Sequence, residues 1–326
     1  LHRSRGLGDV YKRQGQTSIR LQGPLQLFER FFEPDSFLGT AVSGSSDWQV
    51  LVAIRGMPER GKDADIGVTV TSDLVGTAID LPAPFGKHPE SVRPLTIVEQ
   101  RVAAAERTLR LNYSDLVDGL LVIVPAEQGV ALQRGAITVG GQTPVLPDAN
   151  KLLFSGQLER FRLSDWQPYL GGADAGAGAA AAGSGDDVAV PLAFKLGIDE
   201  LEVLGYELGD VSVSVGSSGS RWEIRADGPA VAGDIDLTNT AAGLDKVTMN
   251  LERLLLQNDA GEQPAAAVDS GDDPVPSEFP DLQIIIQQLR YDSTDLGLFE
   301  AKAFKQPGGL YFIERVLLAS DLVSVR

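Results

Sequence analysis

The chain of 326 residues contains no cysteine, only two histidines and two methionines, and 6% aromatic residues. Without cysteine it can form neither a disulfide nor a thiolate nucleophile nor a cysteine-ligated metal site. His2 and His88 are too few for a histidine metal cluster. A Ser-His-Asp triad would depend on His88, which no G-x-S-x-G elbow accompanies, so we interpret His88 as a surface-loop residue. We therefore predict no catalytic, cofactor-binding or metal-binding residues and no enzyme activity.

Long apolar runs and a basic surface are also missing. No run of about 18 apolar residues exists, so the sequence predicts neither a transmembrane helix nor, at its start, a signal peptide. The net charge of −17 argues against nucleic-acid binding, which draws most of its affinity from Lys and Arg. Residues 1–14 are basic and do not match the rest of the chain, so we interpret them as a non-native leader. We expect the chain to be an internal fragment of a longer protein.

One stretch has the spacing of a nucleotide-binding loop but lacks its chemistry. Gly56–Lys62 fits G-x-x-x-x-G-K, yet Asp63 stands where the motif needs a Ser or Thr hydroxyl for magnesium. A strand pattern comes next instead of a helix, so no helix N-terminus is expected to hold phosphate. We interpret the stretch as a hairpin loop.

Alternating apolar and polar residues are abundant, and turn residues separate them about every ten residues. This pattern predicts an all-β protein with an elongated, twisted and curled antiparallel sheet, groove-like and built from repeats. Short helices are expected only at Pro24–Phe32 and Asp165–Leu170. Residues 94–111 fit either a helix or two strands with a loop near Ala103–Ala105, and we favour the strands.

An internal repeat organises the second half of the chain. Pro191–Val215 returns as Pro280–Ala303, and each copy reads as strand, tight Leu-Gly turn, strand. Leu208–Gly209 matches Leu296–Gly297. The apolar residues of one parity after these positions are expected to line up as one stripe, the candidate ligand-lining set: Val211, Val213, Val215, Phe299, Ala301 and Ala303.

These patterns divide the chain into segments. Residues 15–170 form a β module with a short helix near 24–32, residues 188–257 the first repeat unit, and residues 279–326 a truncated second repeat unit. Residues 171–187 and 258–278 are rich in Ala, Gly, Asp and Pro, which predicts mobile loops rather than domain hinges.

Several short motifs, taken in order, resemble the YhdP group of AsmA-like bacterial envelope proteins over roughly residues 15–326. The motifs are Ser72–Gly76 (SDLVG), Leu81–Lys87 (LPAPFGK), Pro94–Leu95, Arg134–Gly140 (RGAITVG), Phe154–Leu158 (FSGQL), Leu163–Trp166 (LSDW) and the two repeat copies. Each motif is short and turn-like, but their order and spacing together are fairly specific.

The resemblance implies a function that the residues alone do not. Such proteins look like long, curled β-sheets in the periplasm of Gram-negative bacteria, anchored in the inner membrane by a segment absent here, whose hydrophobic groove carries phospholipids toward the outer membrane. The expected partners are phospholipid acyl chains, and no nucleic acid. A structural scaffold that binds partner proteins through sheet edges is the alternative. A hydrolase acting on envelope polymers would need clustered carboxylates, which no motif shows.

Overall fold

The computed structural model describes residues 9–13, 16–25, 37–55, 65–101, 106–126, 129–170, 190–240, 243–257, 279–306, 310–320 and 324–325. Its contacts divide the chain into two compact units. Unit 1 comprises Leu1–Ser155 with Ala177–Val190, and unit 2 comprises Gly156–Gly176 with Pro191–Arg326. The strand β11 (Leu152–Arg162) begins in unit 1 and ends in unit 2.

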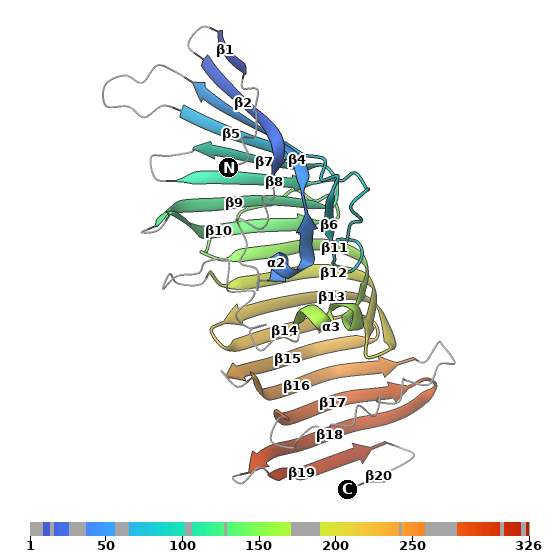
Figure 1. Cartoon of the computed structure of the whole chain (residues 1–326). Coiled ribbons are helices and arrows are strands. Elements are labelled where there is room, and N and C mark those ends of the chain that lie inside the picture. Colours follow the sequence, from blue (N-terminus) through green and yellow to red (C-terminus); the bar gives the residue numbers. More distant parts are fainter. Residues whose placement is uncertain are drawn as a thin grey trace. The chain divides into compact units, whose positions relative to one another are not determined.

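Unit 1 contains an antiparallel sheet whose strands follow one another in chain order (Figure 1). Its strands are β1 (Asp9–Arg13), β2 (Gln16–Leu25), β4 (Ser46–Arg55), β5 (Asp65–Ser72), β7 (Leu95–Arg101), β8 (Arg107–Tyr113), β9 (Val117–Ala126) and β10 (Gly129–Val139). A short helix α2 (Phe37–Ala41) precedes β3 (Val42–Gly44), which pairs with β6 (Thr77–Ile79) as a separate ribbon. Consecutive pairing keeps the connections local.

Unit 2 is built in the same way after the helix α3 (Leu163–Leu170). Its strands are β12 (Leu192–Val203), β13 (Tyr206–Ser218), β14 (Arg221–Asp227), β15 (Val231–Thr240), β16 (Gly243–Leu256), β17 (Asp281–Tyr291), β18 (Thr294–Gln306), β19 (Leu310–Ala319) and β20 (Ser324–Val325). Each strand from β12 to β20 pairs with the next (Figure 1). None of the helices in the described ranges is long and apolar enough to cross a membrane.

The all-β prediction is confirmed, because strands dominate the described residues and helices are few. Helix α3 forms where the sequence predicted one, and residues 94–111 form the strands β7 and β8. The strands β4 and β5 on either side of Gly56–Lys62 pair antiparallel, although that stretch itself lies outside the described residues. Residues 171–187 and 258–278, expected to be mobile, also lie outside them.

The helix expected at Pro24–Phe32 is wrong at its start. Pro24 and Leu25 end the strand β2, where they pair with β4, and residues 26–36 lie outside the described part. Proline is tolerated here because β1 pairs with β2 only as far as Arg20, so no other strand of the described residues pairs with that side of β2 at Pro24. Part of the segment interpreted as a leader, Asp9–Arg13, forms β1.

The expectation of a wholly antiparallel sheet also needs a correction. Strands β16 and β17 pair in parallel, with Met249 opposite Ile284. Parallel neighbours need a connection of about a dozen residues or more. The chain between Gln257 and Phe279 is long enough to return from the end of β16 to the end of the sheet at which β16 begins.

The repeat forms two hairpins with the same irregularity. In β12–β13, Leu201 lies opposite Gly209 at a shift in register, and in β17–β18, Leu289 lies opposite Gly297 at a matching shift. Both glycines have positive φ, 67° and 68°, which residues with a Cβ rarely adopt. The Leu-Gly pairs expected to be tight turns are therefore bulges inside strands, and the first hairpin turns at Leu204–Gly205.

A small core closes one end of the unit 1 sheet. Trp48, Leu74 and Leu95 are buried together, and Leu74 is fully buried although it comes from the loop after β5. Its backbone has φ of 56°, an unfavourable value for a leucine, so the surrounding contacts must hold it there. The motif SDLVG that carried the family resemblance thus places one leucine against the sheet.

We expect Leu74→Ala to destabilise unit 1 by about 2–5 kcal/mol, because it leaves a cavity beside Trp48 and Leu95. Hydrogen exchange should become faster in β4, β5 and β7, while the amides of unit 2 keep their protection. Val75→Ala, at an exposed neighbouring position, is the matched control and should change little. Equal effects of the two substitutions would contradict the assignment of Leu74 to the core.

Candidate functional site

The strand register of unit 2 assembles continuous rows of apolar side chains. Residues directly opposite one another on neighbouring strands lie on the same face of a sheet. We define three rows from the pairings. The first row is Leu196, Val213, Ala226, Gly233, Leu251, Ile286, Phe299 and Leu318. The second row is Phe194, Val215, Ile224, Ile235, Met249, Ile284, Ala301 and Val316. The third row, from β14 to β19, is Trp222, Leu237, Val247, Leu282, Ala303 and Ile313. Together they form the apolar face of unit 2.

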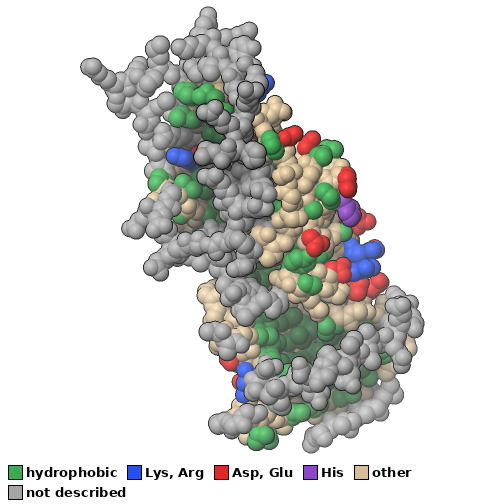
Figure 2. Space-filling view, viewed as in Figure 1, with side chains coloured by type: hydrophobic (Ala, Val, Ile, Leu, Met, Phe, Trp, Pro, Cys, Tyr) green, Lys and Arg blue, Asp and Glu red, His purple; other side chains and the backbone are tan. Residues whose placement is uncertain are grey.

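This face is tightly packed at one end of the strands, and side chains such as Ile313 and Val316 are exposed toward the other. Beside the first row, Val211 is fully buried. The β12–β13 hairpin reaches past the shorter β14–β15 turn, and Tyr206 meets Tyr291 with ring centroids 6.4 Å apart. The second row is only half-buried over most of its length, and Val316 at its β19 end is 49% exposed. Figure 2 shows hydrophobic side chains gathered in the part of the view that holds β14 to β17.

The opposite face of unit 2 carries charge. Arg221 pairs with Asp236 at 2.8 Å, and Arg315 pairs with Glu300 at 3.2 Å. The two arginines are largely exposed and the two carboxylates partly exposed, and such surface pairs contribute little stability, about 0–1 kcal/mol each. Charged side chains are what a water-exposed sheet face ordinarily carries. The apolar face of unit 2 is therefore the feature that needs an explanation.

The structure brings the six sequence-predicted lining residues to this one face, at positions shifted from the simple repeat. Val213 and Phe299 share the first row, and Val215 and Ala301 share the second. Ala303 lies in the third row, and Val211 lies beside the first row at the packed end. The sequence analysis did not identify the residues of β14–β17 that join the two copies, although Ile235 and Met249 stand in clearly alternating stretches.

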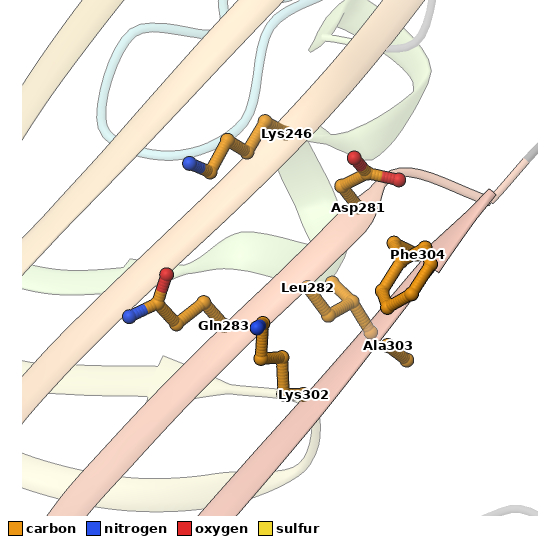
Figure 3. A pocket seen from close by; sticks show the side chains of 7 residues that line it. All are labelled: Lys246, Asp281, Leu282, Gln283, Lys302, Ala303 and Phe304. Atoms are coloured by element: carbon orange, nitrogen blue, oxygen red, sulfur yellow. The ribbon is translucent and has the colours of Figure 1, made fainter. Parts of the chain in front are cut away.

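Two shallow depressions lie on the charged face of unit 2. One has a volume of about 220 Å³, and the side chains of Lys246, Gln283 and Lys302 reach it from neighbouring strands (Figure 3). The other has a volume of about 280 Å³ and lies beside Asp234 and Asn250. Sites for small molecules are usually deeper, about 300–1,000 Å³, and mostly apolar. Neither depression has the character of a cofactor site.

Unit 1 has an apolar face of its own. A row of paired residues crosses its sheet from β2 to β10: Leu21, Val50, Val70, Ile97, Leu111, Gly119 and Ile137. The Trp48–Leu74–Leu95 core closes the strand ends on one side of this row. A second row lies on the same face, on the side of the first row away from this core: Ile19, Val52, Val68, Glu99, Leu109, Leu121 and Gly135. Glu99 interrupts this second row with a charge.

A buried lysine holds the loop that closes the packed end of unit 1. Lys87 is 6% exposed, and its Nζ donates hydrogen bonds to the carbonyl oxygens of Thr77 at 2.8 Å and His88 at 2.9 Å. Burial lowers the pKa of Lys87, and the nearby positive charge of Arg93 lowers it further. The LPAPFGK motif therefore ends in a lysine that satisfies backbone carbonyls inside the loop.

The fold defines a class of protein: an all-β protein that presents an apolar sheet face in each unit. No cluster of three or more potential metal-ligating side chains occurs in the part of the chain that the structure describes. The chain belongs to the YhdP family of AsmA-like envelope proteins, since the family model "YhdP protein" matches residues 7–314. No curated protein and no solved structure matches the chain.

The lowered pKa of Lys87 predicts a specific dependence of stability on pH. Between the folded-state pKa and the ordinary value of 10.5, the unfolded chain binds more protons than the folded chain, so unfolding becomes less favourable as pH rises. We expect the free energy of unfolding of the natural chain to increase relative to that of Lys87→Met as pH rises from neutrality toward 10.5. Denaturant titrations of both chains would measure the difference. A difference that stays flat or falls over this range would contradict the burial argument.

Proposed function

We propose that this chain carries phospholipids between the inner and outer membranes of the bacterial envelope, with their acyl chains on its apolar sheet faces. The observation that supports the proposal best is the unbroken apolar second row of unit 2, from Phe194 on β12 to Val316 on β19. Its half-buried side chains leave apolar surface that water would otherwise cover.

Acyl chains suit such a surface because the hydrophobic effect is non-directional. Each methylene removed from water contributes about 0.8 kcal/mol, wherever along the row it lies. A long row therefore favours binding without fixing the position of the lipid, which is what movement along a sheet requires. A protein ligand would instead need matched hydrogen-bonding groups at defined positions.

The proposal also assigns location and partners. The family is one of bacterial envelope proteins, which supports a place in the periplasm for a protein attached to the inner membrane. The partners are phospholipid acyl chains. The chain performs no covalent chemistry in this proposal, so it needs no cofactor. The competing function is an envelope scaffold that uses its sheet edges and binds no lipid.

Photo-crosslinking distinguishes lipid carriage from a scaffold. We expect a photoreactive amino acid at Val213 or Ala301 to label co-purified phospholipid, and the same group at Ser212 or Glu300 to label little. Each pair of sites lies on one strand but on opposite faces, so the flanking sequence is matched. Lipid attached to the protein is measured by mass spectrometry. Equal labelling of both faces, or none on either, would refute the apolar face as a lipid site and favour the scaffold.

A charge on the apolar face tests the energetics. We expect Val213→Asp to reduce phospholipid loading at least about tenfold, because the carboxylate keeps water on the first row and opposes burial of several methylenes. Ser212→Asp places the same charge on the opposite face of the same strand and should leave loading unchanged. Circular dichroism must show that both variants keep their strand content. Unchanged loading in a folded Val213→Asp chain would contradict the proposal.

A further inference from the structure

A charged pair stands on the apolar face of unit 1. Glu99 follows Leu95 and Ile97 with the same parity on β7, and Arg107 precedes Leu109 and Leu111 with the same parity on β8. Because the pairing of these strands has no irregularity, the two charged side chains share the face that packs against Leu74 at its other end. Arg107 Nη1 donates a hydrogen bond to Glu99 Oε1 at 2.9 Å.

The neighbours of this pair on β5 and β9 are apolar, while Arg101 lies opposite Arg107 on β7. Val68 lies opposite Glu99 on β5, and Ile123 lies opposite Arg107 on β9. Ion pairs such as Arg225 with Asp234 lie instead on the charged face of unit 2. A pair at the border of an apolar face therefore differs in its setting from these surface pairs.

Stability does not account for this placement. The side chain of Glu99 is 28% exposed and that of Arg107 is 43% exposed. At such exposure an ion pair contributes about 0–1 kcal/mol. Two apolar side chains would extend the rows of unit 1 at these positions with at least the same effect.

The geometry points to Arg107 as the contact for the phosphodiester of a phospholipid whose acyl chains lie on the apolar face of unit 1. This inference rests on the proposed function and adds where the headgroup lies. An acyl chain cannot extend past the packed end, where Trp48, Leu74 and Leu95 fill the space. The headgroup must then leave the face at the opposite strand ends, which is where Arg107 lies.

The chemistry of the pair fits a phosphodiester. Arginine offers five N–H donors in a planar fork that matches phosphate oxygens, and Glu99 accepts from only one of its nitrogens. Glu99 orients the guanidinium and competes with the phosphate for it. A competing carboxylate weakens the hold on the headgroup, which suits a lipid that must move on.

Unit 2 has a comparable pair at the accessible end of its apolar face. Lys305 follows Ala303 with the same parity on β18, and its Nζ lies 3.9 Å from Asp245 Oδ1. The packed end with Val211 lies at the other end of the strands. Each apolar face thus ends in tight packing on one side and in a cation beside a carboxylate on the other.

Opposite effects of two neutral substitutions test the inference. The full chain is loaded from vesicles of phosphatidylglycerol that carries a photoreactive group either in the headgroup or at the end of an acyl chain. We expect Arg107→Gln to reduce headgroup labelling of β7 and β8 on the order of tenfold, the effect of losing one charge-assisted hydrogen bond. Glu99→Gln should increase it, because the competing carboxylate is gone. If the pair only held the strands together, both substitutions would reduce labelling.

Controls separate this inference from the proposed function. Arg110→Gln, on the opposite face of β8, should change neither probe, and Arg107→Lys should restore part of the headgroup labelling. Acyl-chain labelling near Ile97 should persist in Arg107→Gln. Persistent acyl labelling with headgroup labelling that ignores Arg107 would overturn the inference and leave lipid carriage standing. Loss of both probes in the natural chain would refute both.

A further arm distinguishes a lipid from a free anion. Inorganic phosphate added in excess should leave headgroup labelling largely intact, because the apolar rows retain the acyl chains. If phosphate removes the labelling while acyl labelling stays, Arg107 belongs to a site for free phosphate, and the inference is wrong.

Discussion

Cross-strand register is the constraint on which both apolar faces depend. Because side chains alternate between the two faces of a strand, a slip of one residue would move a whole apolar row to the charged face. In unit 2 the second row stays apolar across antiparallel pairs and across the parallel β16–β17 pair. The bulges at Leu201 and Leu289 lie near the strand ends, outside the three rows, so their shifts in register do not disturb the rows.

Each unit packs one end of its apolar face, and each does so by a different device. Unit 1 folds a loop back so that Leu74 reaches Trp48 and Leu95, with Lys87 satisfying carbonyls inside that loop. Unit 2 instead extends two hairpins beyond the β14–β15 turn, and their tips meet at Tyr206 and Tyr291. Packing at these ends supplies stability, while row residues such as Val316 keep exposed apolar surface on which a ligand can bind.

The sequence predicted the class of fold because alternation is a local signal, and it placed the six candidate residues on one face for the same reason. It could not predict their rows, since register is set between strands. The match of Leu208–Gly209 with Leu296–Gly297 makes Phe299 the counterpart of Val211, but Phe299 shares a row with Val213, because the parallel β16–β17 pair sets the offset of the second copy. Nothing in the sequence indicated the ion pair of Glu99 and Arg107, because two charges in separate strands become neighbours only when the strands pair.

Alternation fixes the register only to within two residues, and the charged face of unit 2 removes the remaining choice. Asp234 on β15 lies opposite Arg225 on β14. A slip of two residues would keep every apolar side chain on its face, yet it would place Asp234 opposite Glu223 in one direction and opposite Asp227 in the other. Carboxylates directly opposite each other repel, so either slip is disfavoured. The charges on this face therefore favour one register for the pairing of β14 with β15. The apolar face is left free to offer a surface that is uniform along its rows, which a ligand held by non-directional contacts can use at any position.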